Sequence, residues 1–178
     1  MKSGLYHPDE FRDNCGFGLV AHVEGKPSHE LLLSAISSLT CMTHRGGIAA
    51  DGVTGDGCGL LMQKPDSFLR SIAQKQFKKK LAPNYGIGMI FLSQDQTKAQ
   101  QARKVLETEL TAQGLKVLGW RVVPTNPDVC GRMARESLPQ IEQIFIDAPG
   151  VEKKDLAVKL YVARRKAENQ LAADRDFY

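Results

Sequence analysis

The sequence predicts a single domain that mixes α-helices with β-strands. The chain has 178 residues, 42% of them hydrophobic, so it is long enough to bury a core. Charged residues make up 25%, which is close to the average for folded soluble proteins. Short strand-like stretches alternate with longer stretches of helical periodicity. Taken alone, this alternation favours a parallel doubly wound sheet, but a local pattern does not distinguish that sheet from a layered antiparallel arrangement.

The first third of the chain predicts a strand, a helix and a glycine-rich loop. Residues 15–24 (CGFGLVAHVE) are apolar and partly alternating, which is typical of a buried strand. Ser28 is a suitable N-cap for a helix that should end near His44. Residues 44–59 hold six glycines in sixteen positions, which excludes a regular helix there.

The rest of the chain predicts further helices and strands in alternation. Gly114 marks the end of one helix, and the only tryptophan, Trp120, falls in the strand that follows. Residues 126–139 are expected to be irregular or partly helical. The expected strands are 60–63, 86–93, 116–124 and 140–147, and the expected helices are 65–74, 96–113 and 152–173.

Composition and charge exclude several classes of protein. The net charge of +4 is too small to indicate nucleic-acid binding, and the basic run 75–80 (KQFKKK) is typical of a solvated helix end. No stretch approaches the length of a membrane-spanning helix. Residues 1–14 lack the apolar core of a secretory signal. The four cysteines form no disulfide framework, which favours a reducing cytoplasm.

Cys15 is the main candidate for chemistry. A buried cysteine is by default a small apolar residue, but this one stands between a polar leader and the folded-looking chain. If the Asn14–Cys15 bond is cut, the cysteine gains an α-amine with a pKa of about 8. That amine can serve as general base for its own thiol, so nucleophile and base reside in one residue.

The glycine-rich segment and a metal site are the other candidates. The segment lacks the spacing of a phosphate-binding loop, so it is either a tight surface loop or a loop packed against an active site, with Arg45 supplying charge. Asp51 and Asp56 are expected to be turn residues. Cys41 and His44 have a CxxH spacing that His22, Asp56 and Cys58 could extend, but a second matched pair is missing, so no metal site is predicted.

Two motifs carry a resemblance to a known family. Residues 12–29 (RDNCGFGLVAHVEGKPSH) and 42–65 (MTHRGGIAADGVTGDGCGLLMQKP) closely resemble the start of the large chain of glutamate synthases, within the class II glutamine amidotransferases. The similarity continues through GWRVVPTN (119–126), LPQIEQIFIDAP (138–149) and ADRDFY (173–178).

The resemblance implies a fold, a processing step and a reaction. The implied fold is α+β, a four-layer αββα N-terminal-nucleophile fold with two facing antiparallel sheets. Residues 1–14 would be a propeptide and 15–178 the N-terminal part of a glutaminase domain. Cys15 would attack the side-chain amide carbon of glutamine and release ammonia through a thioester. A supporting active-site turn would consist of His44, Arg45, Gly46 and Gly47.

The resemblance also implies groups outside this segment. In glutamate synthases, ammonia passes to 2-oxoglutarate in a downstream synthase domain that uses FMN and an iron–sulfur cluster. The electron donor, whether NADPH, NADH or ferredoxin, is left open, as is a small electron-donating subunit. No cofactor, nucleic acid or membrane partner is expected in these residues.

Some family motifs do not occur, and this leaves alternatives. The motifs RFSTNT and HNGE, which supply the glutamine-holding and oxyanion residues, are absent from the sequence. The segment is therefore expected to be incomplete at its C-terminal end and poorly active or inactive alone. The alternatives are another class II amidotransferase, a non-catalytic interaction domain of the same fold, and, as a distant third, a nucleic-acid-binding protein.

Overall fold

The computed structural model describes residues 16–42, 47–174 and 177. The chain divides into two compact units, one within Met1–Met62 with Cys130–Met133, the other within Gln63–Val129 and Ala134–Tyr178. No helix of the described chain is long and apolar enough to cross a membrane.

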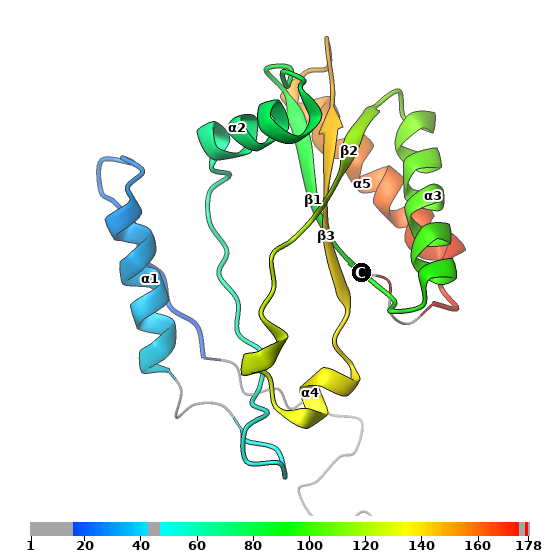
Figure 1. Cartoon of the computed structure of the whole chain (residues 1–178). Coiled ribbons are helices and arrows are strands. Elements are labelled where there is room, and N and C mark those ends of the chain that lie inside the picture. The colour runs from blue at the N-terminus through cyan, green and yellow to red at the C-terminus, as the bar shows by residue number, and fades with distance from the viewer. Residues whose placement is uncertain (1–15, 43–46, 175–176, 178) are drawn as a thin grey trace, which may run out of the picture. The chain divides into compact units, whose positions relative to one another are not determined.

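The second unit is built on a three-stranded antiparallel sheet (Figure 1). Its strand order is β1-β3-β2, so the last strand in sequence lies in the middle. Tyr85 pairs with Asp147 at one end of the β1–β3 ladder and Leu92 with Gln140 at the other. The β2–β3 register shifts between Val117 and Gly119. The strands are β1 (Tyr85–Leu92), β2 (Lys116–Val122) and β3 (Gln140–Asp147).

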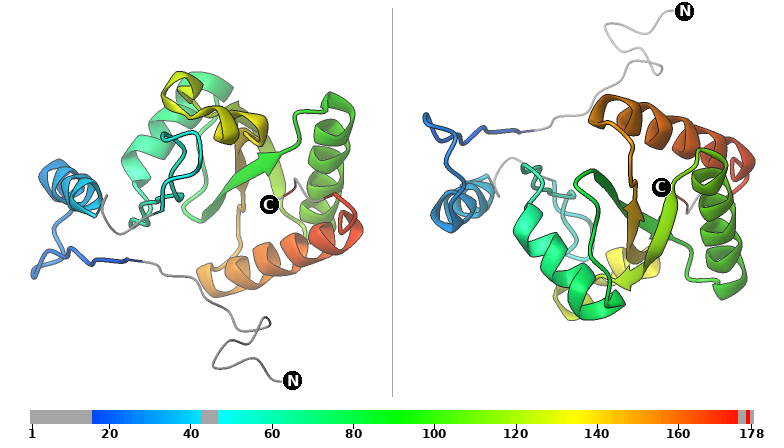
Figure 2. Two further views of the ribbon diagram at one scale, coloured as in Figure 1. Left: turned by 90° about the horizontal axis from the view of Figure 1, so that it is seen from below. Right: turned by 90° about the horizontal axis from the view of Figure 1, so that it is seen from above.

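Helices cover this sheet from both sides. α3 (Gln96–Ala112) and α5 (Lys153–Gln170) pack together on one face, and α2 (Asp66–Phe77) lies against the other (Figures 1 and 2). Ile144 and Ile146 of β3 belong to the core under α3 and α5, whereas Phe145, between them, packs with the α2 side chains. The alternation of β3 therefore supplies apolar side chains to both cores.

Local signals place the helix ends as expected. Ser28 Oγ accepts a hydrogen bond from the Leu31 amide at 3.1 Å, and this caps α1 (His29–Cys41). The Asp95 carboxylate accepts from the amides of Thr97 and Lys98, which lowers the pKa of Asp95 and caps α3. Gly114 has φ +74°, a left-handed conformation in which glycine avoids the strain that other residues meet. The short helices of the predicted irregular stretch are η2 (Pro127–Val129) and α4 (Arg132–Glu136).

The α+β prediction is confirmed, and the parallel sheet suggested by the local pattern is wrong, because β3 pairs antiparallel with both neighbours. β1 and β2, which α3 connects, run in the same direction, but β3 lies between them and runs opposite to both, so no neighbouring strands of this sheet are parallel. A second sheet, which the four-layer arrangement requires, is not formed by the described residues.

Two predicted strands are not formed, and both lie in or next to the first unit. Residues 16–24 and 60–63 are extended or irregular without a partner strand. Their side chains are exposed, with Phe17 at 93% and Leu61 at 99%. Alternating apolar residues favour a strand, but a strand also needs a hydrogen-bonding neighbour, and these segments have none within the described chain.

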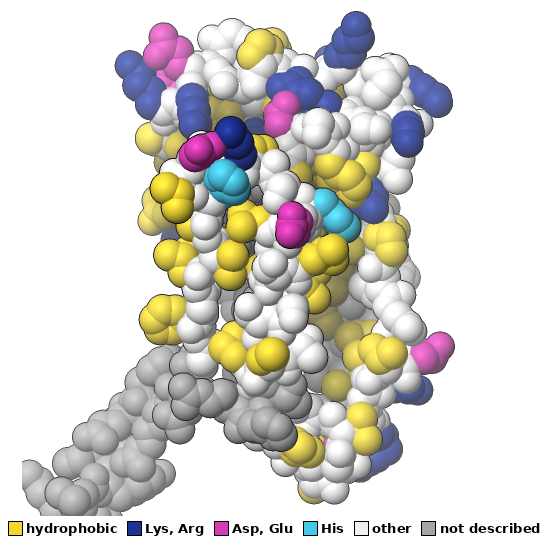
Figure 3. Space-filling view, turned by 90° about the vertical axis from the view of Figure 1, so that its left-hand side faces the viewer, with side chains coloured by type: hydrophobic (Ala, Val, Ile, Leu, Met, Phe, Trp, Pro, Cys, Tyr) yellow, Lys and Arg dark blue, Asp and Glu magenta, His cyan; other side chains and the backbone are white. Residues whose placement is uncertain are grey.

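The described residues of the first unit form no buried core of their own. All buried hydrophobic side chains among the described residues belong to the second unit. α1 buries none of its residues, and Leu33 and Ile36 are about half exposed. Figure 3 looks onto the side of the molecule where α1 lies, and many hydrophobic side chains, in yellow, are exposed on that side.

Candidate active site

Only part of the predicted site falls within the described chain. Cys15, His44, Arg45 and Gly46 lie outside the described residues. Gly47 is described, and so is the remainder of the glycine-rich segment.

Residues 47–56 form a small hairpin closed by backbone hydrogen bonds. Ile48 and Gly55 form an antiparallel bridge. The Ala49 amide donates to the Thr54 carbonyl at 2.7 Å, and the Gly52 amide donates to the Ala49 carbonyl at 3.0 Å. Gly52 has φ +71°, which is a conformation that favours glycine. The glycine-rich segment is thus an ordered turn rather than an open loop.

Asp56 holds Gly47 from the opposite arm of the hairpin. The Gly47 amide donates to Asp56 Oδ2 at 2.7 Å, and the Asp56 amide donates to the Gly47 carbonyl at 3.3 Å. Gly47 is therefore bonded to one residue through both of its backbone polar groups. This fixes the position of the chain directly after the His44-Arg45-Gly46 sequence.

Asp51 organises the tip of the hairpin. Its carboxylate accepts from the Thr54 hydroxyl at 2.6 Å, from the Thr54 amide at 2.7 Å and from the Val53 amide at 3.1 Å. It also accepts from the Met133 amide at 3.1 Å. These bonds, led by that of the Thr54 hydroxyl, hold the pKa of Asp51 well below its usual range. A carboxylate so engaged is a poor proton acceptor, and this confirms the prediction of a structural turn residue.

Gly131 lets the segment 130–133 approach the hairpin. A Cβ atom at this position would lie 2.2 Å from Thr54 Oγ1 and 2.7 Å from Asp51 Oδ2. Such separations do not occur between real atoms, so this contact requires glycine. The sequence signal for the turn is the Asp51-x-x-Thr54 spacing, which is typical of side-chain-to-backbone turns. Nothing in the sequence marks Gly131 or Met133 as the distant partners.

The metal alternative gains no support from the described residues. Within residues 16–42 and 47–174, no three His, Cys, Asp or Glu side chains gather as metal ligands. Cys41 and Cys58 are both exposed. Asp56, a member of the candidate set, is engaged with Gly47 instead.

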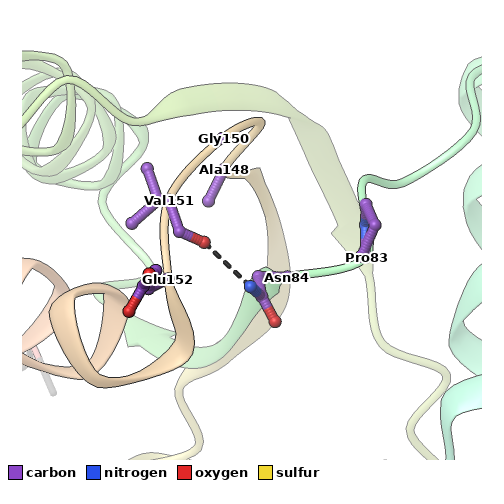
Figure 4. Close-up of a pocket in the computed structure, with 6 residues that line it drawn as sticks. All are labelled: Pro83, Asn84, Ala148, Gly150, Val151 and Glu152. Carbon is purple, nitrogen blue, oxygen red and sulfur yellow. Dashed lines mark hydrogen bonds between the residues drawn. The ribbon is translucent and has the colours of Figure 1, made fainter.

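A hollow of about 260 Å³ lies in the second unit, but its chemistry does not suit catalysis (Figure 4). The Asn84 side-chain amide donates to the Val151 carbonyl at 2.8 Å, so that amide group is already occupied. Glu152 is the only charged residue in the lining, and no thiol or hydroxyl points into the hollow. The lining residues are Pro83, Asn84, Ala148, Gly150, Val151 and Glu152.

Comparison with known proteins decides the family. The family model of class-II glutamine amidotransferases matches residues 15–178. This chain belongs to the class-II glutamine amidotransferases. The amidotransferase family predicted from the Cys-Gly and HRGG…TGDGCG motifs is therefore confirmed, and so is the prediction of an enzyme.

The relatives of this amidotransferase chain include several glutamate synthases. It is 40% identical to the glutamate synthase [NADPH] large chain of Bacillus subtilis, with 98% of this chain and 12% of that protein covered. It is 40% identical to the ferredoxin-dependent glutamate synthase 1 of Arabidopsis thaliana, with 92% and 10% covered. The large chain from Azospirillum brasilense is 36% identical, with 99% and 12% covered. The chain thus spans about a tenth of the length of these relatives.

Proposed function

We propose that this chain is the glutamine-hydrolysing part of a glutamate synthase. The observation that carries the proposal is that the family match begins at Cys15, the residue predicted to become the mature N-terminus. A family that starts at a cysteine, after a short polar leader, fits a nucleophile that needs a free α-amine. Residues 1–14 are the proposed propeptide.

In the proposed reaction, glutamine and water give glutamate and ammonia. The Cys15 sulfur attacks the side-chain amide carbon, and the carbonyl oxygen carries the negative charge in the tetrahedral intermediate. The α-amine of Cys15 takes the thiol proton and returns it to the departing nitrogen, which leaves as ammonia. Water then cleaves the thioester, and the carboxylate of glutamate forms as the thiol is released.

The hairpin 47–56 supports the site in this proposal. Through Asp56 it fixes Gly47, and so the exit of the turn that starts at His44. Enzymes gain rate when groups near the reacting atoms are held in place before the substrate arrives. The motifs RFSTNT and HNGE do not occur in the sequence, so the proposal assigns only the nucleophile and this turn to the chain.

The longer reaction is proposed by likeness to the relatives. Ammonia would reach 2-oxoglutarate in a synthase domain, with FMN and an iron–sulfur cluster supplying electrons there. Such a cluster needs several cysteine thiolates, and the described residues gather no such ligand set, so it is assigned no place here. A cytoplasmic location is proposed because the spacing of the cysteines predicts no disulfide framework. An electron-donating subunit or ferredoxin is proposed as partner.

The test combines intact mass with a glutaminase assay on the full natural protein that carries this chain. We expect a mature species that lacks residues 1–14, and we expect Cys15→Ala to abolish glutamine hydrolysis. Cys41→Ala is the matched control, because this exposed cysteine lies outside both motifs and should leave the rate unchanged. Retention of Met1–Asn14 in an active protein would refute the cysteine mechanism. Full activity of the Cys15→Ala variant would favour a different nucleophile.

A further inference from the structure

Two Asp-Gly dipeptides stand close together in the glycine-rich segment. They are Asp51-Gly52 at the tip of the hairpin and Asp56-Gly57 at its end. In such a dipeptide the glycine nitrogen can attack the side-chain carboxyl carbon of the aspartate, because glycine has no Cβ to crowd the approach. Both dipeptides carry the same reacting groups, so a difference in their reactivity comes from the structure around them.

Asp51-Gly52 is protected at both reacting groups. The Asp51 carboxylate accepts four hydrogen bonds, with Thr54 as the main partner, and the Gly52 amide donates to the Ala49 carbonyl at 3.0 Å. The bonds to Asp51 hold its pKa well below its usual range and so keep it ionised. An ionised carboxylate resists attack because its negative charge repels the electron pair of the incoming nitrogen.

Asp56-Gly57 is protected at neither group to the same degree. Among residues 16–42 and 47–174, the Asp56 carboxylate accepts a single hydrogen bond, from the Gly47 amide at 2.7 Å. The Gly57 amide donates to no group in that part of the chain, and a Cβ at Gly57 would meet no atom within 4 Å. Both residues are exposed, so solvent supplies the proton that the carboxyl group needs and the water that completes the reaction.

We propose that Asp56-Gly57 is a site of spontaneous isomerisation to isoaspartate, independently of the glutaminase function. The Gly57 nitrogen attacks Cγ of the protonated Asp56 carboxyl group, and a C–N bond forms. The nitrogen loses its proton and the C–O bond breaks, so one water molecule leaves and a five-membered succinimide ring remains. Water then opens the ring at either carbonyl, which gives back aspartate or yields isoaspartate.

Isomerisation would release Gly47 from its partner across the hairpin. In isoaspartate the main chain runs through the former side-chain carbons, and the free carboxylate is attached to the α-carbon. The 2.7 Å bond from the Gly47 amide to Asp56 Oδ2 is then lost. What remains between the two residues is the long bond, 3.3 Å, from the Asp56 amide to the Gly47 carbonyl. The Gly47 amide should therefore exchange hydrogen faster in the isomerised protein.

The test incubates the full natural protein in water enriched in oxygen-18 and follows each aspartate by peptide mass spectrometry. Every passage through the succinimide adds one oxygen-18 atom, so Asp51 and Asp56 report in the same molecule. We expect at least about tenfold more label at Asp56, because one pKa unit changes the protonated fraction of a carboxyl group tenfold. In urea, where the hairpin bonds are absent, the two labels should agree within about twofold. Equal labelling in the folded protein, no label at Asp56, or a preference that persists in urea overturns the proposal.

Two variants change one dipeptide at a time. Asp56→Glu keeps the charge but requires a six-membered ring, so the label at position 56 should fall at least about tenfold while that at Asp51 stays the same. Thr54→Val removes the hydroxyl that donates to Asp51 at 2.6 Å and should raise the label at Asp51 about threefold. Hydrogen exchange at the Ala49 amide, which donates to the carbonyl of residue 54, checks that the hairpin still closes. An unchanged label at Asp51 in the Thr54 variant would contradict protection by hydrogen bonds.

Discussion

Removing one partner of the ion pair between Arg103 and Glu142 should destabilise the second unit strongly. Arg103 Nε and Nη2 on α3 donate to the two carboxylate oxygens of Glu142 on β3, at 2.8 and 2.7 Å. The Glu142 side chain is 9% exposed and that of Arg103 is 23% exposed. Removing one partner of a buried pair costs about 3–5 kcal/mol because a charge is left without compensation. Since Arg103 is partly exposed, we expect Arg103→Met to cost about 2 kcal/mol.

Single and double variants of this pair should differ in how much stability they lose. Arg103→Met strands the buried Glu142 carboxylate, whereas Arg103→Met with Glu142→Leu leaves no charge behind. The double variant should therefore lose less than about 1 kcal/mol, and the coupling energy should be about 2 kcal/mol. Arg164→Met is the control: its pair with Glu168 is on the surface, so about 0.5 kcal/mol or less is expected.

Urea unfolding followed by Trp120 fluorescence measures these effects. Trp120 is the only tryptophan, and it packs against the core that lies under α3 and α5. With a slope of about 2 kcal/mol per molar urea, the midpoint of Arg103→Met should fall by about 1 M. A double variant that loses the sum of the two single losses would refute the argument, as would a loss for Arg103→Met no larger than that for Arg164→Met.

Three further changes should have measurable results. Burial, followed by the bond to Asp66, raises the pKa of Tyr85 to about 12. Tyr85→Phe should therefore remove the last step of the phenolate absorbance titration. Because the phenol of the unfolded chain ionises near pH 10, the stabilisation from protonated Tyr85 is lost as pH rises from about 10 to about 12. Gly119→Ala would place a Cβ 2.5 Å from Phe77 Cε1, and urea unfolding should show a loss of about 1–3 kcal/mol. Gly131→Ala would place a Cβ 2.2 Å from Thr54 Oγ1, so the Thr54 amide should exchange hydrogen faster.

The glycine predictions share one control. A Cβ at Gly57 would meet no atom within 4 Å, so Gly57→Ala should change neither stability nor exchange. Equal effects at Gly57 and Gly119 would mean that backbone freedom, not crowding, dominates. For Tyr85, a wild-type titration in which all tyrosines ionise together would contradict the expected shift.

Local sequence signals predicted most elements of the second unit, and they predicted the start of α1 in the first unit. Residues 140–147 form a strand as expected, and Ser28 caps α1 as expected. These signals succeed because capping and alternation are local properties. The order β1-β3-β2 depends on contacts far apart in sequence, which is why the local pattern suggested a parallel sheet. Residues 15–24 were predicted as a strand, and 16–24 form none, because alternation reports a favoured conformation and not the presence of a partner.

The candidate site was predicted in part. The sequence predicted Asp51 and Asp56 as turn residues; the hydrogen bonds of Asp51 confirm this for Asp51, whereas Asp56 lies in the arm of the hairpin, where it holds Gly47. The contact with the Met133 amide was not predictable, because 82 residues separate it from Asp51 and no motif links them. Cys15 lies outside the described residues and stays a prediction, as do the propeptide and the domain limits.

The central place of β3 sets the order in which the sheet can assemble during synthesis. β1 and β2 do not pair with each other, so both wait for the ribosome to deliver Gln140–Asp147. At about 5–20 residues per second, the interval from Leu92 to Asp147 lasts about 3–11 s. β1 has unpaired edges throughout that time, and β2 joins it once Val122 has been made, which is the condition under which nascent chains aggregate or are held by chaperones. The translation rate between these strands is therefore a physical determinant of the yield of folded protein.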